Sequence, residues 1–278
     1  MTMSVLPRLV GAMVCGVLAL SSLGAAAAPK ASMATASKPV TLEFFSWSIF
    51  RLTSPKGTVI LTNPFVTNPD SPVKVADFPK VDGIVVADGH RDEVGSTDEI
   101  ALATGAKIIT SFEMFNVWFE PRKVPVEQVM RSGPGDTEVI KDVTIRNVGS
   151  VHGSGTADKL DGGKAMGFFI KFDNGLTVYF AGSTDTTLDM QLWARKYKPD
   201  VAILCLSNGR DPEDLVEQAR LLRTGNPNLK TVIPHHVRLQ PPPGSHNAAD
   251  VEAAFKKSGL PIKVIKPEFN KVYTLAKG

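Results

Sequence analysis

Polar side chains that can bind metal or transfer protons follow four apolar segments of this chain. Each group comes directly after a predicted strand, which is where α/β folds place their sites. The candidates are Asp88, His90, Asp92, Glu93, His152, Ser183, Asp185, His235 and His236. Taken singly, each of these residues can also be a turn former, a helix cap or a solvated group. Four such groups with glycines beside them favour a binding site.

The spacing inside the first group allows two neighbouring sites. Residues two apart in an extended segment face the same side, so Asp88 and His90 can reach one point. Asp92 and Glu93 follow on the turn and can reach a second point beside it.

Composition excludes several classes of protein. The chain has 278 residues, and 31 basic against 28 acidic residues give +3, too close to balance to indicate a nucleic-acid partner. A hydrophobic content of 43% with 21% charged residues excludes a disordered polyelectrolyte. Two cysteines, Cys15 and Cys205, exclude a disulfide-stapled scaffold and a cysteine-built zinc ribbon. Cys205 lies inside an apolar run and is expected to be a small buried hydrophobe.

The elements that must position these residues alternate between strands and helices. Asn174-Gly175 predicts a two-residue hairpin turn, Ser96 with Glu99 predicts a capping box, and Asp211-Pro212 predicts a helix start. Together these patterns predict a mixed α/β protein with two sheets. Predicted strands cover 41–52, 58–61, 83–87, 143–148, 167–173, 176–182, 201–206 and 231–234, with further strands from 262; predicted helices cover 96–105, 213–223 and 248–258.

The N-terminus has the pattern of a secretory signal peptide over residues 1–28. Arg8 supplies the positive region, Leu9 to Leu20 is apolar, and four alanines at 25–28 suit a signal peptidase. An uncleaved membrane anchor is the alternative, although the apolar run is short for a bilayer of about 30 Å. Residues 29–39 are expected to be a flexible tether. The mature protein is therefore expected in the periplasm or outside the cell, without Cys15 and without a stable membrane span.

The order of these segments resembles the metallo-β-lactamase superfamily, and within it the small metal-dependent hydrolases that include ascorbate-phosphate lactonase-like proteins. The resemblance covers nearly all of residues 41–277 and implies a four-layer αββα sandwich, so that residues 40–278 form one domain. The segments that carry it are LTNPFVTNP at 61–69, DGIVVADGHRDEVGSTDEIALATGAKII at 82–109, the His152 loop, GFFIKFDNGLTVYFAGSTD at 167–185, PDVAILCL at 199–206 and VIPHH at 232–236.

The family holds two metal ions with a His-x-His-x-Asp-His motif and three later ligands, and this chain matches that pattern in part. The positions that keep the family's residue types are His90, Asp92, His152 and His236. The positions that differ are Asp88 for the first motif histidine, Glu93 for the last, Ser183 for the bridging aspartate, Trp47 for a histidine near the first strand, and Asn63 for the aspartate of an Asp-Pro pair.

The resemblance therefore implies one altered metal site and one weakened site. Asp88, His90 and His152 would form a two-histidine, one-carboxylate set that suits zinc, manganese or iron, with zinc preferred. Asp92, Glu93 and His236 would form the second set without the bridge at Ser183. Asp185 could compensate only if its loop bends, and His235 could compete with His236 although successive strand residues face opposite ways. One ion is expected rather than two.

The function that these expectations imply is metal-dependent hydrolysis of a small ester, lactone or phosphoester by an exported enzyme. The metal would activate water, and Asp92 would be the general base or an orienting group. The alternative is a degenerate relative without hydrolase activity that acts as a binding or structural protein. The sequence indicates a small-molecule substrate and gives no information on oligomeric state.

Overall fold

The computed structural model describes residues 38–207 and 209–277. The expected signal peptide at 1–28, Cys15 and residues 29–37 of the expected tether lie outside these described residues. The described chain belongs to one compact unit, Ser37–Gly278. None of its helices is both long and apolar enough to cross a membrane.

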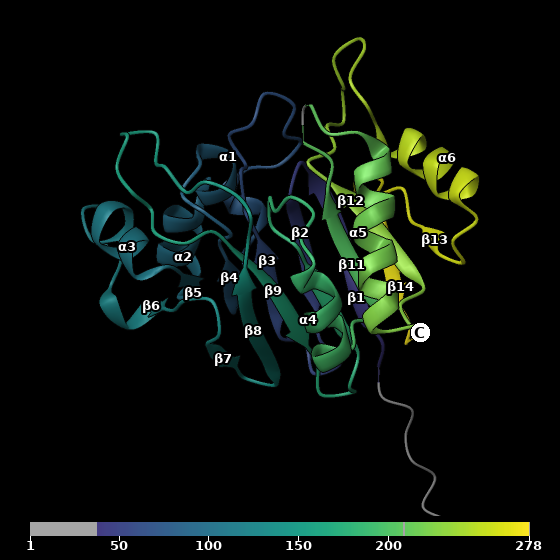
Figure 1. Ribbon diagram of the computed structural model, residues 1–278. Helices are drawn as coiled ribbons and strands as arrows, with labels where there is room; N and C mark the ends of the chain where they lie inside the picture. Colours follow the sequence, from purple (N-terminus) through teal and green to yellow (C-terminus); the bar gives the residue numbers. More distant parts are fainter. Residues whose placement is uncertain (1–37, 208, 278) are drawn as a thin grey trace, which may run out of the picture. The chain divides into compact units, whose positions relative to one another are not determined.

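Two seven-stranded mixed sheets face each other (Figure 1). In the first, the antiparallel strands β14, β1, β2 and β3 are followed by parallel pairing through β4, β5 and β6. In the second, β7 to β10 pair antiparallel, and β10 to β13 pair parallel. In spatial order, the first sheet contains β14 (Val272–Leu275), β1 (Val40–Ser46), β2 (Ile49–Thr53), β3 (Val59–Thr62), β4 (Gly83–Val85), β5 (Lys107–Thr110) and β6 (Val129–Arg131), and the second contains β13 (Lys263–Val264), β12 (Thr231–His235), β11 (Val201–Cys205), β10 (Thr177–Phe180), β9 (Met166–Lys171), β8 (Val143–Gly149) and β7 (Thr137–Ile140).

Three separate apolar cores show that the described chain has four layers. One core lies between the sheets and includes Phe44, Phe168 and Phe180. A second packs the first sheet against the short helices α1 (Arg91–Val94), α2 (Thr97–Thr104), α3 (Phe112–Met114), η1 (Val75–Asp77), η2 (Phe115–Phe119) and η3 (Val126–Gln128). A third packs the second sheet against α4 (Asp189–Tyr197), α5 (Pro212–Gly225) and α6 (Ala248–Ser258). This arrangement confirms the expected αββα sandwich.

Several local expectations needed correction. The run 41–52 is two strands, because the chain turns at Trp47, which has a left-handed φ of 52°. The hairpin between β9 and β10 turns through residues 172–176, and of Asn174 and Gly175 only the glycine has positive φ, so the two-residue turn was wrong. Helix α2 begins after Ser96 as expected, but the Ser96 side chain makes no capping hydrogen bond. Asp211 does cap α5, in a reciprocal pair with Asp214.

Candidate metal centre

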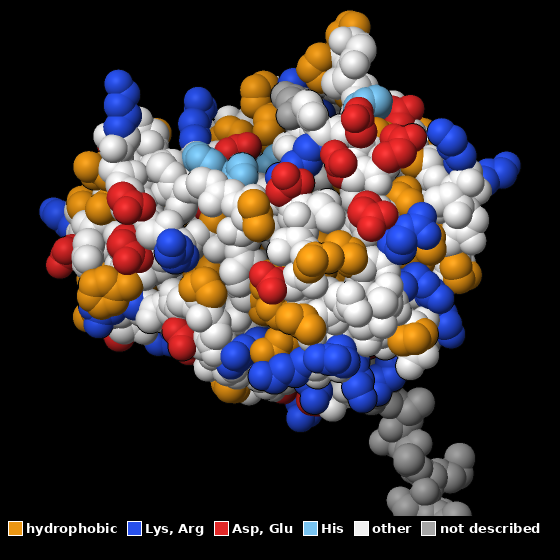
Figure 2. All heavy atoms as spheres, viewed as in Figure 1, with side chains coloured by type: hydrophobic (Ala, Val, Ile, Leu, Met, Phe, Trp, Pro, Cys, Tyr) orange, Lys and Arg blue, Asp and Glu red, His pale blue; other side chains and the backbone are white. Residues whose placement is uncertain are grey.

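The candidate residues meet where the carboxyl ends of strands from both sheets face each other. Asp88 follows β4, and His90 immediately precedes α1. His152 follows β8 and His236 follows β12, and both of these strands belong to the second sheet. In Figure 2 the histidine side chains gather along the upper edge of the visible face, between basic and acidic groups. The strand ends therefore bring together residues that are up to about 150 positions apart.

Asp88, His90 and His152 bring three ligand atoms within 4.8 Å of one another. His90 Nδ1 lies 3.0 Å from Asp88 Oδ1, and His152 Nε2 lies 3.9 Å from Asp88 Oδ2. The two imidazole rings meet edge to face, with centroids 4.9 Å apart. Ligands about 2.1 Å from a shared ion lie roughly 3–4 Å from each other, so this spacing is suitable for one divalent ion.

The carboxylate of Asp88 provides the strongest evidence that this site fits a metal. Its Oδ2 is buried and has no hydrogen-bond partner among the described residues, although it points toward His152. Burial raises the pKa of Asp88, while the hydrogen bond to Asp88 raises the pKa of His90. A buried, unpartnered carboxylate oxygen is costly unless a proton or a cation accompanies it. A divalent ion would supply that partner.

Asp92 and Glu93, both on α1, meet the imidazole of His236 from the other sheet. His236 Nε2 is 3.1 Å from Glu93 Oε1 and 3.6 Å from Asp92 Oδ2. Burial opposes ionisation of Asp92, but the contact with His236, the charges of His236 and His90 and a backbone hydrogen bond together outweigh burial and lower its pKa. The residues of the expected second set, Asp92, Glu93 and His236, therefore lie together, and Nε2 is the atom of His236 that faces the two carboxylates.

Glu93 is held by three donors from three parts of the chain. The side-chain amide of Asn63 donates to Oε2, and the hydroxyl of Ser183 donates to Oε1, which also faces His236. Asn63 is fixed in turn, because its Oδ1 accepts from the backbone N–H of Ala87 at 3.0 Å. With 1% exposure, Glu93 is a fully buried carboxylate whose oxygens are occupied by protein donors.

His235 and His236 face one another instead of pointing to opposite sides. The left-handed φ of 59° at His236 ends the strand alternation, and the two rings lie 4.9 Å apart. His236 Nδ1 is 3.0 Å from His235 Nδ1 and 3.4 Å from Cys205 Sγ. Burial lowers the pKa of His235 well below its usual value. For His236, burial opposes ionisation, but the charges of Cys205 and Glu93 together with the side-chain contacts to Asp92 and Cys205 outweigh burial and raise the pKa.

Asp185 does not join this cluster. It is exposed, and its carboxylate accepts a hydrogen bond from the backbone N–H of Thr186 at 2.7 Å within its own loop. Ser183, which precedes it, contributes its hydroxyl to Glu93 and its carbonyl to Arg210.

Three residues near the centre were missed by sequence reasoning or assigned a lesser role. Ser48 comes from the turn between β1 and β2, and its Oγ is 2.9 Å from His236 Nδ1 and 3.1 Å from His235 Nδ1. Cys205 is buried as expected, but its sulfur contacts His236. Arg210 donates to the carbonyls of Ser183 and Thr184. Only its position after β11 signalled a role for Arg210.

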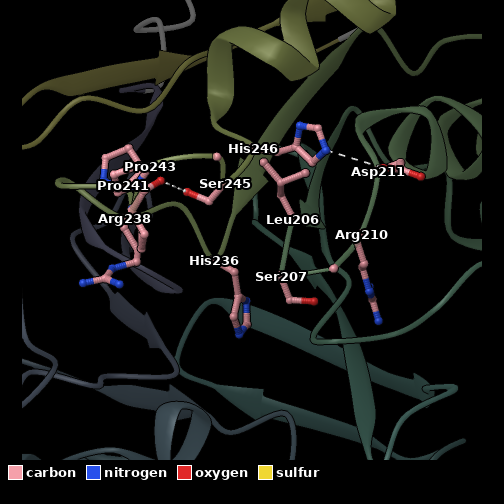
Figure 3. A pocket seen from close by; sticks show the side chains of 13 residues that line it. Leu206, Ser207, Arg210, Asp211, His236, Arg238, Pro241, Pro243, Ser245 and His246 are labelled. Carbon is pink, nitrogen blue, oxygen red and sulfur yellow. Dashed lines mark hydrogen bonds and ion pairs between the residues drawn. The ribbon is translucent and has the colours of Figure 1, made fainter.

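A cavity of about 430 Å³ opens beside His236, under the loop that joins β12 to α6. Figure 3 shows Arg210 and His236 extending in the same direction, while Arg238 lies across the cavity. The outer wall includes Pro241, Pro243 and His246, whose Nε2 is 3.5 Å from Asp211 Oδ1. A small molecule bound here would contact His236, and Arg210 and Arg238 line the same cavity.

Comparison with known proteins gives a consistent picture. The model of the beta-lactamase superfamily domain matches residues 58–244. A UPF0173 metal-dependent hydrolase from Myxococcus xanthus is 33% identical over 253 residues, which is 88% of this chain and 87% of that protein. Another, from Koribacter versatilis, is 34% identical over 193 residues, covering 67% of this chain and 79% of the relative.

Solved structures share the fold. Igni18, a metallo hydrolase from Ignicoccus hospitalis, has a TM-score of 0.72 and 27% identity, covering 87% of this chain and 100% of that one. An isothiocyanate hydrolase from Delia radicum gut bacteria has a TM-score of 0.66 and 17% identity, covering 86% and 100%.

Proposed function

Because the chain belongs to the metallo-β-lactamase superfamily and to its UPF0173 metal-dependent hydrolases, we propose that it hydrolyses a small ester, lactone or phosphoester with one divalent ion. The ion is held by Asp88, His90 and His152, and zinc is preferred over manganese or iron. The observation that carries this proposal is the buried, unpartnered Oδ2 of Asp88 beside two imidazoles.

A metal in this position supplies Lewis acidity, which activates water and polarises a carbonyl or phosphoryl group. The side chains of this site have separate roles around it. Asp88 Oδ1 accepts from the backbone N–H of His90 at 2.9 Å and lies 3.0 Å from Nδ1 of the same residue. This double contact fixes the imidazole before substrate arrives, and preorganisation is what makes such a site efficient.

Asp92 is the proposed general base or orienting group. Its lowered pKa keeps it ionised at neutral pH, and its negative charge contributes to the raised pKa of His90. With its side chain 34% exposed, it can accept a hydrogen bond from water at the edge of the site. A weakly basic carboxylate serves mainly to orient a water molecule and to receive its proton as attack proceeds.

The substrate is proposed to be a small molecule that enters through the cavity beside His236. Arg210 and Arg238 line this cavity and are suited to a substrate with a carbonyl, carboxylate or phosphoryl oxygen.

Metal analysis with site variants tests this proposal. Purified protein should contain a divalent ion or acquire one from zinc, manganese or iron, and it should hydrolyse some of a panel of simple esters, lactones and phosphoesters. Asp88→Asn and His152→Ala should lower turnover by about 100-fold or more, since metal activation is worth several kcal/mol. Asp185→Asn is the matched control and should retain activity.

Two outcomes would count against it. A protein that contains no metal and gains none contradicts the hydrolase. A protein that binds metal but hydrolyses nothing in the panel supports the degenerate relative that acts as a binding protein.

We further propose that residues 1–28 are a cleaved signal peptide and that the mature enzyme is periplasmic or secreted, because Arg8, the apolar run and four alanines follow the signal-peptide pattern. N-terminal sequencing of the native protein and cell fractionation test this. An intact Met1 on a cytoplasmic protein would contradict it.

A further inference from the structure

A second group of ligand atoms lies at Nδ1 of His236, whereas Nε2 of the same ring faces Asp92 and Glu93. Cys205, His235 and His236 each offer one ligand atom within 4.8 Å of the other two. His236 Nδ1 lies 3.0 Å from His235 Nδ1 and 3.4 Å from Cys205 Sγ. Ser48 Oγ lies 2.9 Å and 3.1 Å from the two Nδ1 atoms. Ser48, Cys205 and His235 are fully buried, and the side chain of His236 is 6% exposed.

Both imidazoles are oriented so that Nδ1 is the atom available to a ligand. His235 Nε2 is 3.1 Å from the carbonyl oxygen of Gly182, which can only accept, so Nε2 carries the proton. His236 Nε2 is 3.1 Å from Glu93 Oε1, an oxygen that also accepts from Ser183. A ring N–H bound to a carbonyl or carboxylate is the usual outer support of a metal-bound histidine.

We propose that Cys205, His235 and His236 bind a second divalent metal of the zinc type, with Ser48 Oγ on the fourth side. In a tetrahedral site with metal–nitrogen distances of about 2.0–2.1 Å and a metal–sulfur distance of about 2.3 Å, neighbouring ligand atoms lie about 3.3–3.6 Å apart. The observed separations of 2.9–3.4 Å need only a small expansion to reach this range.

The backbone assembles this site from both sheets. Cys205 and His235 are directly paired at the ends of β11 and β12. The left-handed conformation of His236 turns its ring back toward them, a conformation that few non-glycine residues adopt. His236 N donates to Trp47 O, and Trp47 N donates to Val237 O, so the turn carrying Ser48 is fixed against β12.

The separations lie within the range of hydrogen bonds, but protons alone leave contacts around His236 Nδ1 unsatisfied. A proton on His236 Nδ1 would face Ser48 Oγ, His235 Nδ1 and Cys205 Sγ at 2.9–3.4 Å, and one N–H can donate well to only one of them. A divalent ion satisfies all of them at once. The thiolate of Cys205 together with the nearby carboxylate of Glu93 balances its charge, and metal loading releases the thiol and Nδ1 protons.

This site also accounts for the altered second set of the family pattern. Asn63 and Ser183 hold the carboxylate of Glu93, and Glu93 in turn holds Nε2 of His236. Nδ1 of His236 is therefore the nitrogen that binds the metal. The site formed by Cys205, His235 and His236 shares no ligand with the set Asp88, His90 and His152, so this inference does not depend on hydrolysis.

Cobalt titration of metal-free, full-length protein tests it. A Cys15→Ser background leaves Cys205 as the only cysteine of the chain. Adding Co²⁺ should produce the near-ultraviolet charge-transfer absorption of a thiolate–cobalt bond, and Cys205→Ser should abolish it and lower the bound cobalt by one ion per chain. Asp88→Asn should keep the absorption and lose the other ion.

Variants of His235 and of a control residue test whether His235 is a ligand of this site. His235→Gln should weaken cobalt binding at the thiolate site by at least 10-fold, whereas His246→Gln should leave it unchanged. If the Cys205 variant does not fold, X-ray absorption of the zinc-loaded Asp88→Asn protein should show one sulfur neighbour at about 2.3 Å. Absence of the thiolate absorption in folded parent protein, or its persistence at full affinity in His235→Gln, would overturn the proposal.

Discussion

At the scale of single residues, the contact between Asn63 and Glu93 exchanges donor and acceptor relative to the family pattern. The resemblance places an aspartate at 63 and a histidine at 93, where a carboxylate would accept from an imidazole. In this chain the amide of Asn63 donates and the carboxylate of Glu93 accepts. The two departures therefore compensate one another, and each should be tolerated only in the presence of the other.

A double-mutant cycle measures this compensation. Asn63→Asp alone places two carboxylates in buried contact and should cost about 3 kcal/mol of unfolding free energy. Adding Glu93→His supplies a donor and should recover at least about 2 kcal/mol in urea unfolding. Additive effects of the two substitutions would show that the contact does not couple them.

The paired histidines show why part of the site could not be predicted from sequence. Strand periodicity places His235 and His236 on opposite faces, and the left-handed φ of His236 reverses that expectation. The alternation rule holds only while a strand continues. It gives no sign of the backbone hydrogen bond from His236 N to Trp47 O, which forms where β12 ends. By contrast, Asp88 and His90 are close in sequence and do meet, as their spacing suggested.

At the scale of elements, Gly182 links the end of β10 to the orientation of His235. It has a φ of 61°, and a Cβ there would lie 2.4 Å from the carbonyl oxygen of Met166. Its own carbonyl accepts from His235 Nε2. The residue must be glycine for the strand end to approach β9 this closely.

Gly182→Ala should therefore cost about 2–4 kcal/mol of unfolding free energy, from steric overlap and the left-handed backbone. Gly149→Ala is the matched control, since nothing lies within 4 Å of its added Cβ and its φ is ordinary. Equal unfolding free energies of the two variants in urea would show that the close approach of residue 182 to β9 does not require glycine.

Asp70 connects the segment after β3 to the loop over the cavity. Its carboxylate accepts from Trp47 Nε1 at 3.0 Å and from the backbone N–H of Gln240 at 3.2 Å, with Arg238 nearby at 3.6 Å. Burial opposes ionisation, but these donors and the charge of Arg238 outweigh it and lower the pKa of Asp70. The contribution of Asp70 to stability is thus present above its unfolded-state pKa of about 3.9 and is lost as pH falls through the lower folded value.

Asp70→Asn should lower the unfolding free energy by about 1–2 kcal/mol at pH 7, because an amide cannot accept from both donors. The difference from the parent protein should shrink as pH falls below about 4. Asp158→Asn, at an exposed position, is the control and should change the unfolding free energy by less than about 0.5 kcal/mol. A constant difference between pH 7 and pH 3 would refute the role of the Asp70 charge.

At the scale of the whole molecule, the fold was more predictable than the site. The alternating apolar runs and helix starts gave the two sheets, and α6 has the predicted bounds, ending at Gly259 in the left-handed conformation. Those signals are local and repeat along the chain. The contacts of Ser48 with His235 and His236 join positions almost 190 apart and arise only when the two sheets face each other.

The same arrangement predicts that metal ties the two sheets together. Asp88 and His90 come from the first sheet and His152 from the second, so an ion held by all three binds the folded state alone. At zinc concentrations about 100-fold above Kd, one such ion adds about 2.7 kcal/mol, or roughly 5–10 °C in melting temperature for a domain of this size. Calorimetry with and without a chelator measures this shift. Asp88→Asn should reduce the shift, and Asp88→Asn combined with Cys205→Ser should remove it, because the second sheet would then have no metal-mediated link to the first. Equal shifts in the parent protein and Asp88→Asn would exclude Asp88 as a ligand.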